Sequence, residues 1–298
     1  MNVTAEGLRL SDKSRSMNWR PTSGVAVAMQ RAELIARARD YFTLHKVLSV
    51  DTPAFGSASV TDPHIASFKV AASSYLQTSP EYYMKRLLAA GYPDIYSICR
   101  VFRAEERGRR HLPEFTLIEW YRRNFLLDDI VADTCNLLAH MLDRHLGAVQ
   151  ILDYQEAFRQ HAGLDPFHCT LDDLADRVAA DAALRSSLGD DRDAWLDLVL
   201  SFVVVPRFDK QCLTVLQHYP CSQAALARRC PANPELADRF EVFFGDLELA
   251  NGYVELGDRT EQAERMNADI QRRTNLGLPA VPVDRNLLAA LDAGLPNC

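Results

Sequence analysis

The stretch FRAEERGRRHLPEF, residues 102–115, concentrates arginine and glutamate in a chain whose formal net charge is -7. The segment IYSICRVFR, which ends at the second residue of this stretch, is dense in β-branched and aromatic side chains. The segment FTLIEWY, which starts at its last residue, alternates in character. Both patterns predict strands, so we expect an antiparallel pair joined by a basic loop. Such a hairpin would bring Arg103 and Phe115 close together.

Arg103 and Phe115 offer the two contacts that hold a nucleotide. A guanidinium group recognises phosphate in a planar, bidentate way, and an aromatic ring gives a base a stacking surface. Strand alternation puts Arg103 and Glu105 on one face, and it groups Phe115 with Glu119 and Tyr121. The alternative is a solvated hairpin tip whose arginines and glutamates only pair with one another, at about 0–1 kcal/mol for each pair.

A second hairpin is predicted in RFEVFFGDLELANGYVEL, residues 239–256, with Gly245–Asp246 as its two-residue turn. This turn places Phe243 opposite Glu248 and Glu241 diagonal to Glu248 on the same face. Two carboxylates on one face repel each other unless a divalent cation lies beside them, and Mg²⁺ binds through one or two carboxylates plus substrate phosphates. The alternative is two glutamates on a solvent-exposed face.

Asn251, Tyr253 and Glu255 follow directly and share a face by alternation. In a regular strand that face would be opposite to the one that carries Glu248. For all of them to line one pocket the strand must slip by one residue, and we predict a β-bulge at Asn251–Gly252.

Besides the proposed metal pair, four carboxylates have candidate positions in the pocket: Glu81, Glu105, Glu119 and Glu255. So many acids beside a phosphate site indicate a substrate that carries positive charge, such as an amino acid with a charged side chain. Because an unpaired buried charge is costly, such a pocket would reject uncharged side chains.

The rest of the chain predicts an α+β fold, with an antiparallel sheet flanked by helices. Residues 1–24 are expected to form an N-terminal extension and residues 25–298 a catalytic domain, with a mostly helical insertion around 125–205. Further predicted elements are a helix over 24–46, a short strand near Pro53, a helix that starts at Ser79–Pro80 and stops at Gly91, a strand over 212–220 and a charged helix over 258–277.

The composition is that of an ordinary globular protein, with 48% hydrophobic residues, 24% charged residues and a pI near 5.6. The acidic balance argues against a general nucleic-acid binder. No apolar run reaches the roughly 20 residues of a membrane span, and the N-terminus lacks a signal-peptide core, so we expect a cytoplasmic protein without a membrane partner. The seven cysteines form no CxxC pair, and we expect them to be reduced and mostly buried, with no zinc site.

Taken together, these segments resemble class II aminoacyl-tRNA synthetases. Residues 102–115 look like their motif 2, and TSPEYYMKRLL, FTLIEWY and LELANGYVEL are similar to lysyl-tRNA synthetases. With VTDPHI and GLPNC, the resemblance is greatest to a short relative of those enzymes, the elongation factor P lysyltransferases. It covers most of residues 25–298.

The resemblance implies a role for each candidate residue. Arg103 is the catalytic residue and contacts the α-phosphate of ATP and the amino-acid carboxylate, Phe115 stacks on adenine, and Glu241 and Glu248 hold Mg²⁺. The remaining assignments are ATP contacts from Glu105, His111, Glu248 and Leu249, and a lysine pocket of Ser79, Pro80, Glu81, Glu119, Tyr121, Asn251, Tyr253 and Glu255.

The implied reaction is the ATP-dependent activation of lysine or (R)-β-lysine as an adenylate, followed by transfer to a lysine side chain of elongation factor P. The segment from 30 to Pro53 resembles motif 1, which implies a homodimer. About 25 residues precede it, whereas a lysyl-tRNA synthetase has an anticodon-binding barrel there, so we expect no recognition of a tRNA anticodon.

The chain departs from the family pattern at Ala104 and Leu112, and motif 3 would begin just where residue 298 stands. We therefore expect a C-terminally truncated domain that lacks motif 3. Two other functions stay open. One is an inactive synthetase-like module that binds ATP, lysine or a partner without catalysis, and the other is an amide ligase similar to a class II asparagine synthetase.

Overall fold

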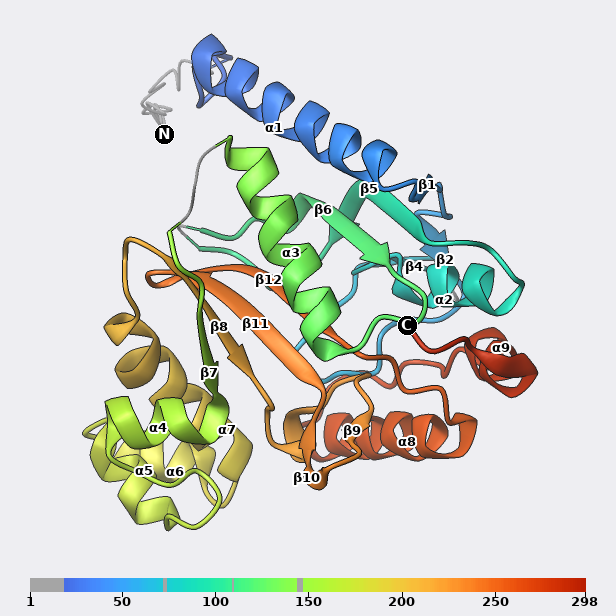
Figure 1. Ribbon diagram of the computed structural model, residues 1–298. Helices are drawn as coiled ribbons and strands as arrows, with labels where there is room; N and C mark the ends of the chain where they lie inside the picture. Colours follow the sequence, from blue (N-terminus) through green and yellow to red (C-terminus); the bar gives the residue numbers. More distant parts are fainter. Residues whose placement is uncertain (1–18, 72–73, 109, 144–146) are drawn as a thin grey trace, which may run out of the picture.

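Short strands in mainly antiparallel pairs form the centre of the protein, with helices around them (Figure 1). A computed structural model describes residues 19–71, 74–108, 110–143 and 147–298. The predicted α+β class is confirmed. Among the described residues, no helix is long and apolar enough to cross a membrane.

The strands form separate sheets with the orders β1-β5-β6, β2-β4-β3, β12-β11-β8-β7 and β10-β9. Their bounds are β1 Leu48–Ser49, β2 Phe55–Gly56, β3 Lys69–Ala71, β4 Ser74–Leu76, β5 Ile95–Phe102, β6 Glu114–Tyr121, β7 Gln150–Asp153, β8 Leu213–Gln217, β9 Arg229–Cys230, β10 Asn233–Ala237, β11 Arg239–Phe244 and β12 Leu247–Tyr253. The expectation of an antiparallel sheet holds for most pairs, but β1 runs parallel to β5 and β7 parallel to β8.

Nine α-helices stand in the described part of the chain. Their bounds are α1 Val25–Leu44, α2 Glu81–Ala89, α3 Leu127–Leu142, α4 Tyr154–Ala162, α5 Leu171–Arg177, α6 Ala182–Leu188, α7 Arg192–Val199, α8 Arg259–Asn275 and α9 Arg285–Gly294. Several begin at side-chain caps, because short polar side chains accept hydrogen bonds from free backbone N–H groups. Thr170, for example, caps α5 and Asp284 caps α9.

The two predicted hairpins both form. β5 pairs with β6 in the register Val101↔Phe115, and β11 pairs with β12 across the Gly245–Asp246 turn. Gly245 has φ +58, a left-handed conformation that glycine adopts without steric cost. Helix α3 packs against α1 and against β11 and β12, and its Leu127 and Val131 join Val215 in a buried cluster.

Helices α4, α5, α6 and α7 form a lobe of their own beside β7 and β8, visible at the lower left of Figure 1. Its core contains Tyr154, Phe158 and Trp195, which are at most 2% exposed. Most of the segment 125–205 is helical, as expected, yet the edge strand β7 lies within it. Helices α8 and α9 pack together on another side, and α9 also contacts α2.

Local details differ from the prediction at the start of α2. Pro80, not Ser79, is the residue before the helix, and Ser79 Oγ accepts a hydrogen bond from Glu81 N at 3.0 Å. Gly91, with φ +91, follows the helix end as predicted. The cysteines were expected to be mostly buried, which is wrong: only Cys298 is buried, and the other six are partly exposed.

Candidate active site

The first hairpin brings Arg103 to the ring of Phe115, as the sequence predicts. Arg103 N donates to Pro113 O at 2.9 Å, one residue beyond the paired strands, and Arg103 Cζ lies 5.1 Å from the Phe115 ring centroid. A guanidinium over an aromatic face is a favourable cation–π arrangement. A phosphate contact and a stacking surface therefore stand side by side.

The acidic neighbour of Arg103 is not the predicted one. Strand β5 ends at Phe102, so alternation no longer applies beyond it, and Glu105 lies in a turn with its side chain exposed. Arg103 instead pairs with Glu106 at 3.0 Å. The expected shared face of Arg103 and Glu105 is therefore wrong, and a contact of Glu105 with ATP stays a prediction.

The loop between β5 and β6 is fastened to the second hairpin. Arg110 forms an ion pair with Asp246 at 2.9 Å and also donates to the Asp246 backbone oxygen. A hollow at the loop is lined in part by His111 and by Leu112, which is 67% exposed. His111 thus lies at the solvent edge, and its predicted nucleotide contact is untested. Arg109 lies outside the described residues.

Strand β12 carries a β-bulge, but not where it was predicted. Phe243 pairs with Glu248 and Val242 with Ala250, so Leu249 is the extra residue, whereas the prediction was Asn251–Gly252. The bulge has the expected effect, because it turns the side chains after it onto the face that Glu248 occupies. The Leu249 side chain packs against the buried cluster around α3. Only the Leu249 backbone is then left for the predicted contact with ATP.

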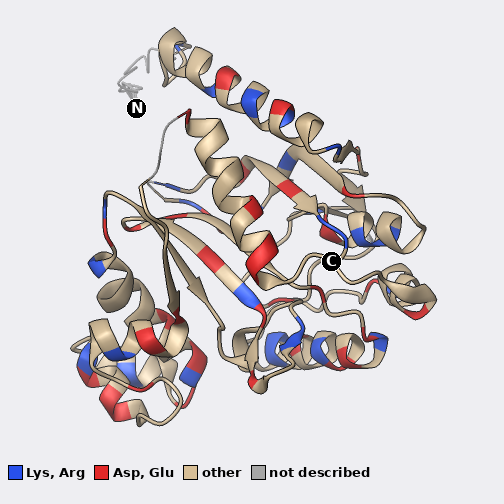
Figure 2. Cartoon of the chain, viewed as in Figure 1, with Lys and Arg blue, Asp and Glu red and all other residues tan. Residues whose placement is uncertain are grey.

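Glu241 and Glu248 form the predicted pair of carboxylates. Arg239 holds Glu241 Oε1 at 2.5 Å, and Figure 2 shows acidic and basic positions next to each other on β11. Burial in the surrounding protein and the nearby Glu241 charge raise the pKa of Glu248 to about 7. A cation beside them would relieve that repulsion, so the donor set fits Mg²⁺. Asn251 pairs with Glu241 across the hairpin, and its Oδ1 accepts from Arg239 Nε at 3.3 Å, so its place in the lysine pocket stays a prediction.

A buried ion network joins α2 to the residues after β12. Lys85 Nζ lies 2.6 Å from Glu81 Oε1 and 2.5 Å from Glu255 Oε2, and the Lys85 side chain is only 1% exposed. Tyr253 donates its hydroxyl to Glu81 Oε1 at 2.5 Å. The backbone N–H of Glu255 donates to Cys298 O at 2.9 Å. Three predicted pocket residues therefore lie together, from segments that are far apart in the sequence.

Glu119 extends this network from the first hairpin. Ser79 donates its hydroxyl to Glu119 Oε2 at 2.5 Å, and Tyr121 donates to Glu119 Oε1 at 2.9 Å. Burial, reinforced by the Glu81 charge, raises the pKa of Glu119 to about 7. Burial likewise raises the pKa of Glu255 to about 8, although Lys85 opposes that shift. The pocket thus holds more acid than its own cation neutralises.

Lys85 is the pocket residue that sequence reasoning missed. A signal was present, because Glu81 and Lys85 are four residues apart on a predicted helix and side chains at that spacing meet on one face. Their partner Glu255 could not be found that way. The contacts with Glu81 and Glu255 raise the pKa of Lys85 despite its burial, so its ammonium stays charged.

The sheet, the arginine and ring on one hairpin and the paired glutamates on the other define a class II aminoacyl-tRNA synthetase domain. The family model for tRNA synthetases class II (D, K and N) matches residues 8–298, and the chain belongs to this family. The predicted resemblance is confirmed.

Among the relatives are proteins with the name elongation factor P--(R)-beta-lysine ligase. The one from Haemophilus ducreyi is 40% identical over 299 residues, which cover 97% of this chain and 90% of the relative. Those from Sodalis glossinidius and Klebsiella pneumoniae are 40% and 39% identical over 295 residues, or 96% of this chain and 90% of each relative.

Proposed function

We propose that the chain is an ATP-dependent ligase that activates lysine or (R)-β-lysine as an adenylate and transfers it to a lysine side chain of elongation factor P. The names of the relatives support this reaction. The observation that carries the substrate class is the buried network, in which Glu81 and Glu255 contact the single ammonium group of Lys85 and Glu119 adds a third carboxylate near it.

The charges of this network match a substrate with two ammonium groups. When ionised, the three carboxylates carry three negative charges and Lys85 supplies one positive charge, so two negative charges lack a counterpart within the network. Leaving a buried charge unpaired is costly. Lysine and β-lysine each bring an α- or β-ammonium and a distal ammonium, while their carboxylate is free to approach Arg103.

The nucleotide end would then perform the chemistry by positioning and charge stabilisation. Arg103 binds the substrate carboxylate and the α-phosphate, and Phe115 stacks on the base, which aligns the carboxylate oxygen with the α-phosphorus. The oxygen attacks, pyrophosphate leaves and the aminoacyl-adenylate forms. Arg103 stabilises the charge that develops on the phosphate. In the second step a neutral amine attacks the acyl carbon and AMP leaves.

Glu241 and Glu248 are the residues that would hold Mg²⁺, since they are acidic and share one face of the second hairpin. A bound Mg²⁺ would neutralise charge on the ATP phosphates. Arg239 keeps Glu241 in place by its contact with Oε1. Dense surrounding protein raises the pKa of the Glu248 carboxyl, but the residue still has surface open to solvent, so an ion that arrives with ATP can reach it.

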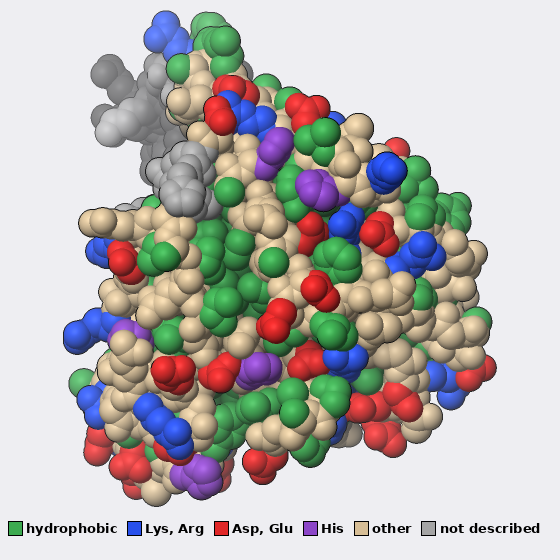
Figure 3. All heavy atoms as spheres, in the orientation of Figure 1, with side chains coloured by type: hydrophobic (Ala, Val, Ile, Leu, Met, Phe, Trp, Pro, Cys, Tyr) green, Lys and Arg blue, Asp and Glu red, His purple; other side chains and the backbone are tan. Residues whose placement is uncertain are grey.

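The remaining expectations belong to the same proposal. They are the extension 1–24, the catalytic domain 25–298, a cytoplasmic location, no anticodon recognition and a homodimer. Dimer formation is supported by the first half of α1, where Val25, Val27 and Met29 are 77%, 55% and 68% exposed. The face in Figure 3 shows basic, acidic and histidine side chains scattered, with no single basic patch for RNA.

The amide-ligase alternative is disfavoured by the same charges. An enzyme that activates aspartate needs cationic partners for the second carboxylate, whereas this pocket has an excess of acid. The alternative of an inactive module can be tested only by measuring whether the chain has enzymatic activity.

Pyrophosphate exchange into ATP tests the proposal directly. We expect exchange that depends on lysine or β-lysine, and Glu255→Gln should raise the KM for that amino acid roughly ten- to a hundredfold. The matched control is Glu114→Gln, which changes an exposed glutamate at the start of β6. Aspartate-dependent exchange would favour the amide ligase, and no exchange with any amino acid would favour the inactive module. Transfer of labelled amino acid to elongation factor P, with tRNA as the competing acceptor, tests the second step.

A further inference from the structure

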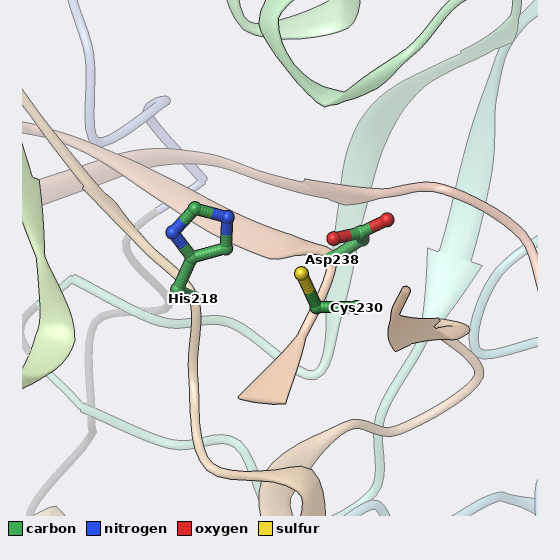
Figure 4. Close-up of side chains that lie close together, drawn as sticks. All are labelled: His218, Cys230 and Asp238. Atoms are coloured by element: carbon green, nitrogen blue, oxygen red, sulfur yellow. The ribbon is translucent and has the colours of Figure 1, made fainter. Parts of the chain in front are cut away.

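A second cluster of metal-ligating side chains lies outside the proposed active site. The ligand atoms of His218, Cys230 and Asp238 all lie within 4.8 Å of one another. Figure 4 shows the three side chains converging, with an edge of the His218 ring toward the Cys230 sulfur and the Asp238 carboxylate. The residues come from the end of β8, from β9 and from the junction of β10 and β11.

Backbone hydrogen bonds hold these three segments in register. His218 N donates to Arg239 O at 3.0 Å, Ala237 N donates to Tyr219 O at 2.8 Å, and Asp238 N donates to Arg228 O at 3.0 Å. The frame therefore exists without a ligand. Preorganised ligands bind a metal without first ordering the chain, which is the main cost for a site in a flexible segment.

His218 has two features that are typical of a metal ligand. Its φ of +58 is in the left-handed region, which is uncommon for a residue with a side chain and is found most often at functional sites. Its Nδ1 contacts Asp153 Oδ1 at 2.8 Å. A carboxylate on one ring nitrogen orients the imidazole and leaves the other nitrogen, Nε2, for a metal.

The local charges also balance around a divalent ion. Arg228 Nε donates to Asp238 Oδ2 at 2.8 Å, and that contact uses only one of the two carboxylate oxygens. A divalent ion, a Cys230 thiolate, the Asp238 and Asp153 carboxylates and the Arg228 guanidinium sum to zero charge, with His218 neutral. The His218 side chain is 25% exposed, so an ion can enter from solvent.

We propose that His218, Cys230 and Asp238 form a zinc site with three protein ligands and Asp153 behind the histidine. Imidazole, thiolate and carboxylate are all zinc ligands, at about 2.0–2.3 Å, and the fourth position would be taken by water. On binding, the S–H bond of Cys230 breaks, a Zn–S bond forms and the proton passes to solvent. The ion would tie β8, β9 and the start of β11 together.

Titration of the chelator-treated, full-length chain with Co²⁺ and then Zn²⁺ tests this site. We expect one Co²⁺ per chain, a thiolate-to-cobalt charge-transfer band in the near ultraviolet, and loss of the band when Zn²⁺ displaces Co²⁺. Cys230→Ser should abolish the band. The matched control is Cys212→Ser, another partly exposed cysteine, which should keep it. Asp153→Asn should weaken Zn²⁺ binding by roughly 10- to 100-fold.

Absence of the band in the unaltered chain overturns the proposal, whatever the variants do. A band of equal strength in Cys230→Ser also overturns it, because the thiolate ligand must then be elsewhere. Circular dichroism of each variant separates a lost site from a lost fold. None of these readouts depends on pyrophosphate exchange, so the zinc site and the proposed ligase activity can fail separately.

Discussion

The amino-acid pocket and the nucleotide end of the site carry their charges in opposite ways. In the pocket, Lys85 is 1% exposed and contacts two carboxylates at once. At the nucleotide end, Arg103 and Glu106 form a pair whose side chains are 26% and 31% exposed. Buried partners are fixed before any ligand arrives, whereas open pairs can separate when a phosphate takes the place of the glutamate.

Because one set of ion pairs is buried and the other is exposed, substitutions in the two regions should differ in their effects on stability and on activity. Removing one partner of a buried ion pair leaves an uncompensated charge and costs about 3–5 kcal/mol, while an exposed pair contributes about 0–1 kcal/mol. Changes in the pocket should therefore affect folding and catalysis together. Changes at the nucleotide end should affect catalysis with little effect on folding.

Lys85→Met should give the largest effect. We expect the free energy of unfolding in urea to fall by about 3–5 kcal/mol, because Glu81 and Glu255 lose their shared cation. Adding Glu255→Gln to this variant should recover part of the loss, since it removes one of the unpaired charges. Lys69→Met, at an exposed lysine, is the control and should change little. If Lys85→Met is as stable as the control, the pocket is not held together by charge.

Arg103→Ala should show the opposite pattern. We expect lysine-dependent pyrophosphate exchange to fall by roughly 10²–10³-fold, because one group that stabilises transition-state charge is lost. The free energy of unfolding should change by about 1 kcal/mol or less. Arg103→Lys should rescue little, since an ammonium group cannot bind a carboxylate and a phosphate with a planar fork. Arg100→Ala, at an exposed arginine on β5, is the control. A large loss of stability in Arg103→Ala would remove the distinction between the two regions.

The same contrast explains what the sequence could predict. Local patterns identified both hairpins, the Gly245–Asp246 turn and the Phe243–Glu248 pairing, because a short turn fixes the register of its strands. They misplaced the bulge, because which residue is extra depends on how Leu249 packs against the cluster around α3. They also misplaced the Glu105 side chain, because strand β5 ends at Phe102 and the alternation of faces does not continue beyond it.

Contacts between distant segments were harder to predict. Glu81 and Glu255 were both expected in the pocket, and the four-residue spacing could have linked Lys85 to Glu81. Nothing local indicated that Lys85 also contacts Glu255. His218, Cys230 and Asp238 illustrate the same limit: they lack the regular spacing of a zinc motif, and the cysteine pattern argued against a zinc site. Residue clusters of this kind are brought together by the way distant segments pack in the fold, and not by regular spacing along the chain.

The pocket should also respond to pH. Burial raises the pKa of Glu119 to about 7 and that of Glu255 to about 8, well above the usual range of a glutamate, so the folded state holds their protons more tightly than the unfolded state. Their contribution to stability is complete below about pH 4.5 and is lost as the pH rises through 7 and 8. A cationic substrate needs these groups ionised, so binding should release protons. Between pH 6 and 9 binding should tighten by up to about tenfold through Glu119 and up to about a hundredfold through Glu255.

Calorimetric titration with lysine in buffers of different ionisation enthalpy measures this proton release. Glu119→Gln should remove one part of the pH dependence and leave the part that belongs to Glu255. Lysine affinity that is constant over this pH range would mean that the carboxylates are already ionised in the free pocket. The charge argument for the substrate would then lose its support from the pKa values.

Arg110→Ala should give the smallest effect and marks the outer limit of the site. Arg110 and Asp246 are 40% and 54% exposed, so we expect almost no loss of stability, and any loss should vanish at high salt. Because this pair fastens the loop to the second hairpin, the KM for ATP should rise a few-fold while the KM for lysine stays unchanged. Arg107→Ala, at the neighbouring exposed arginine, is the matched control. A change in the KM for lysine would show that the loop and the pocket are coupled, and that the two regions do not act separately.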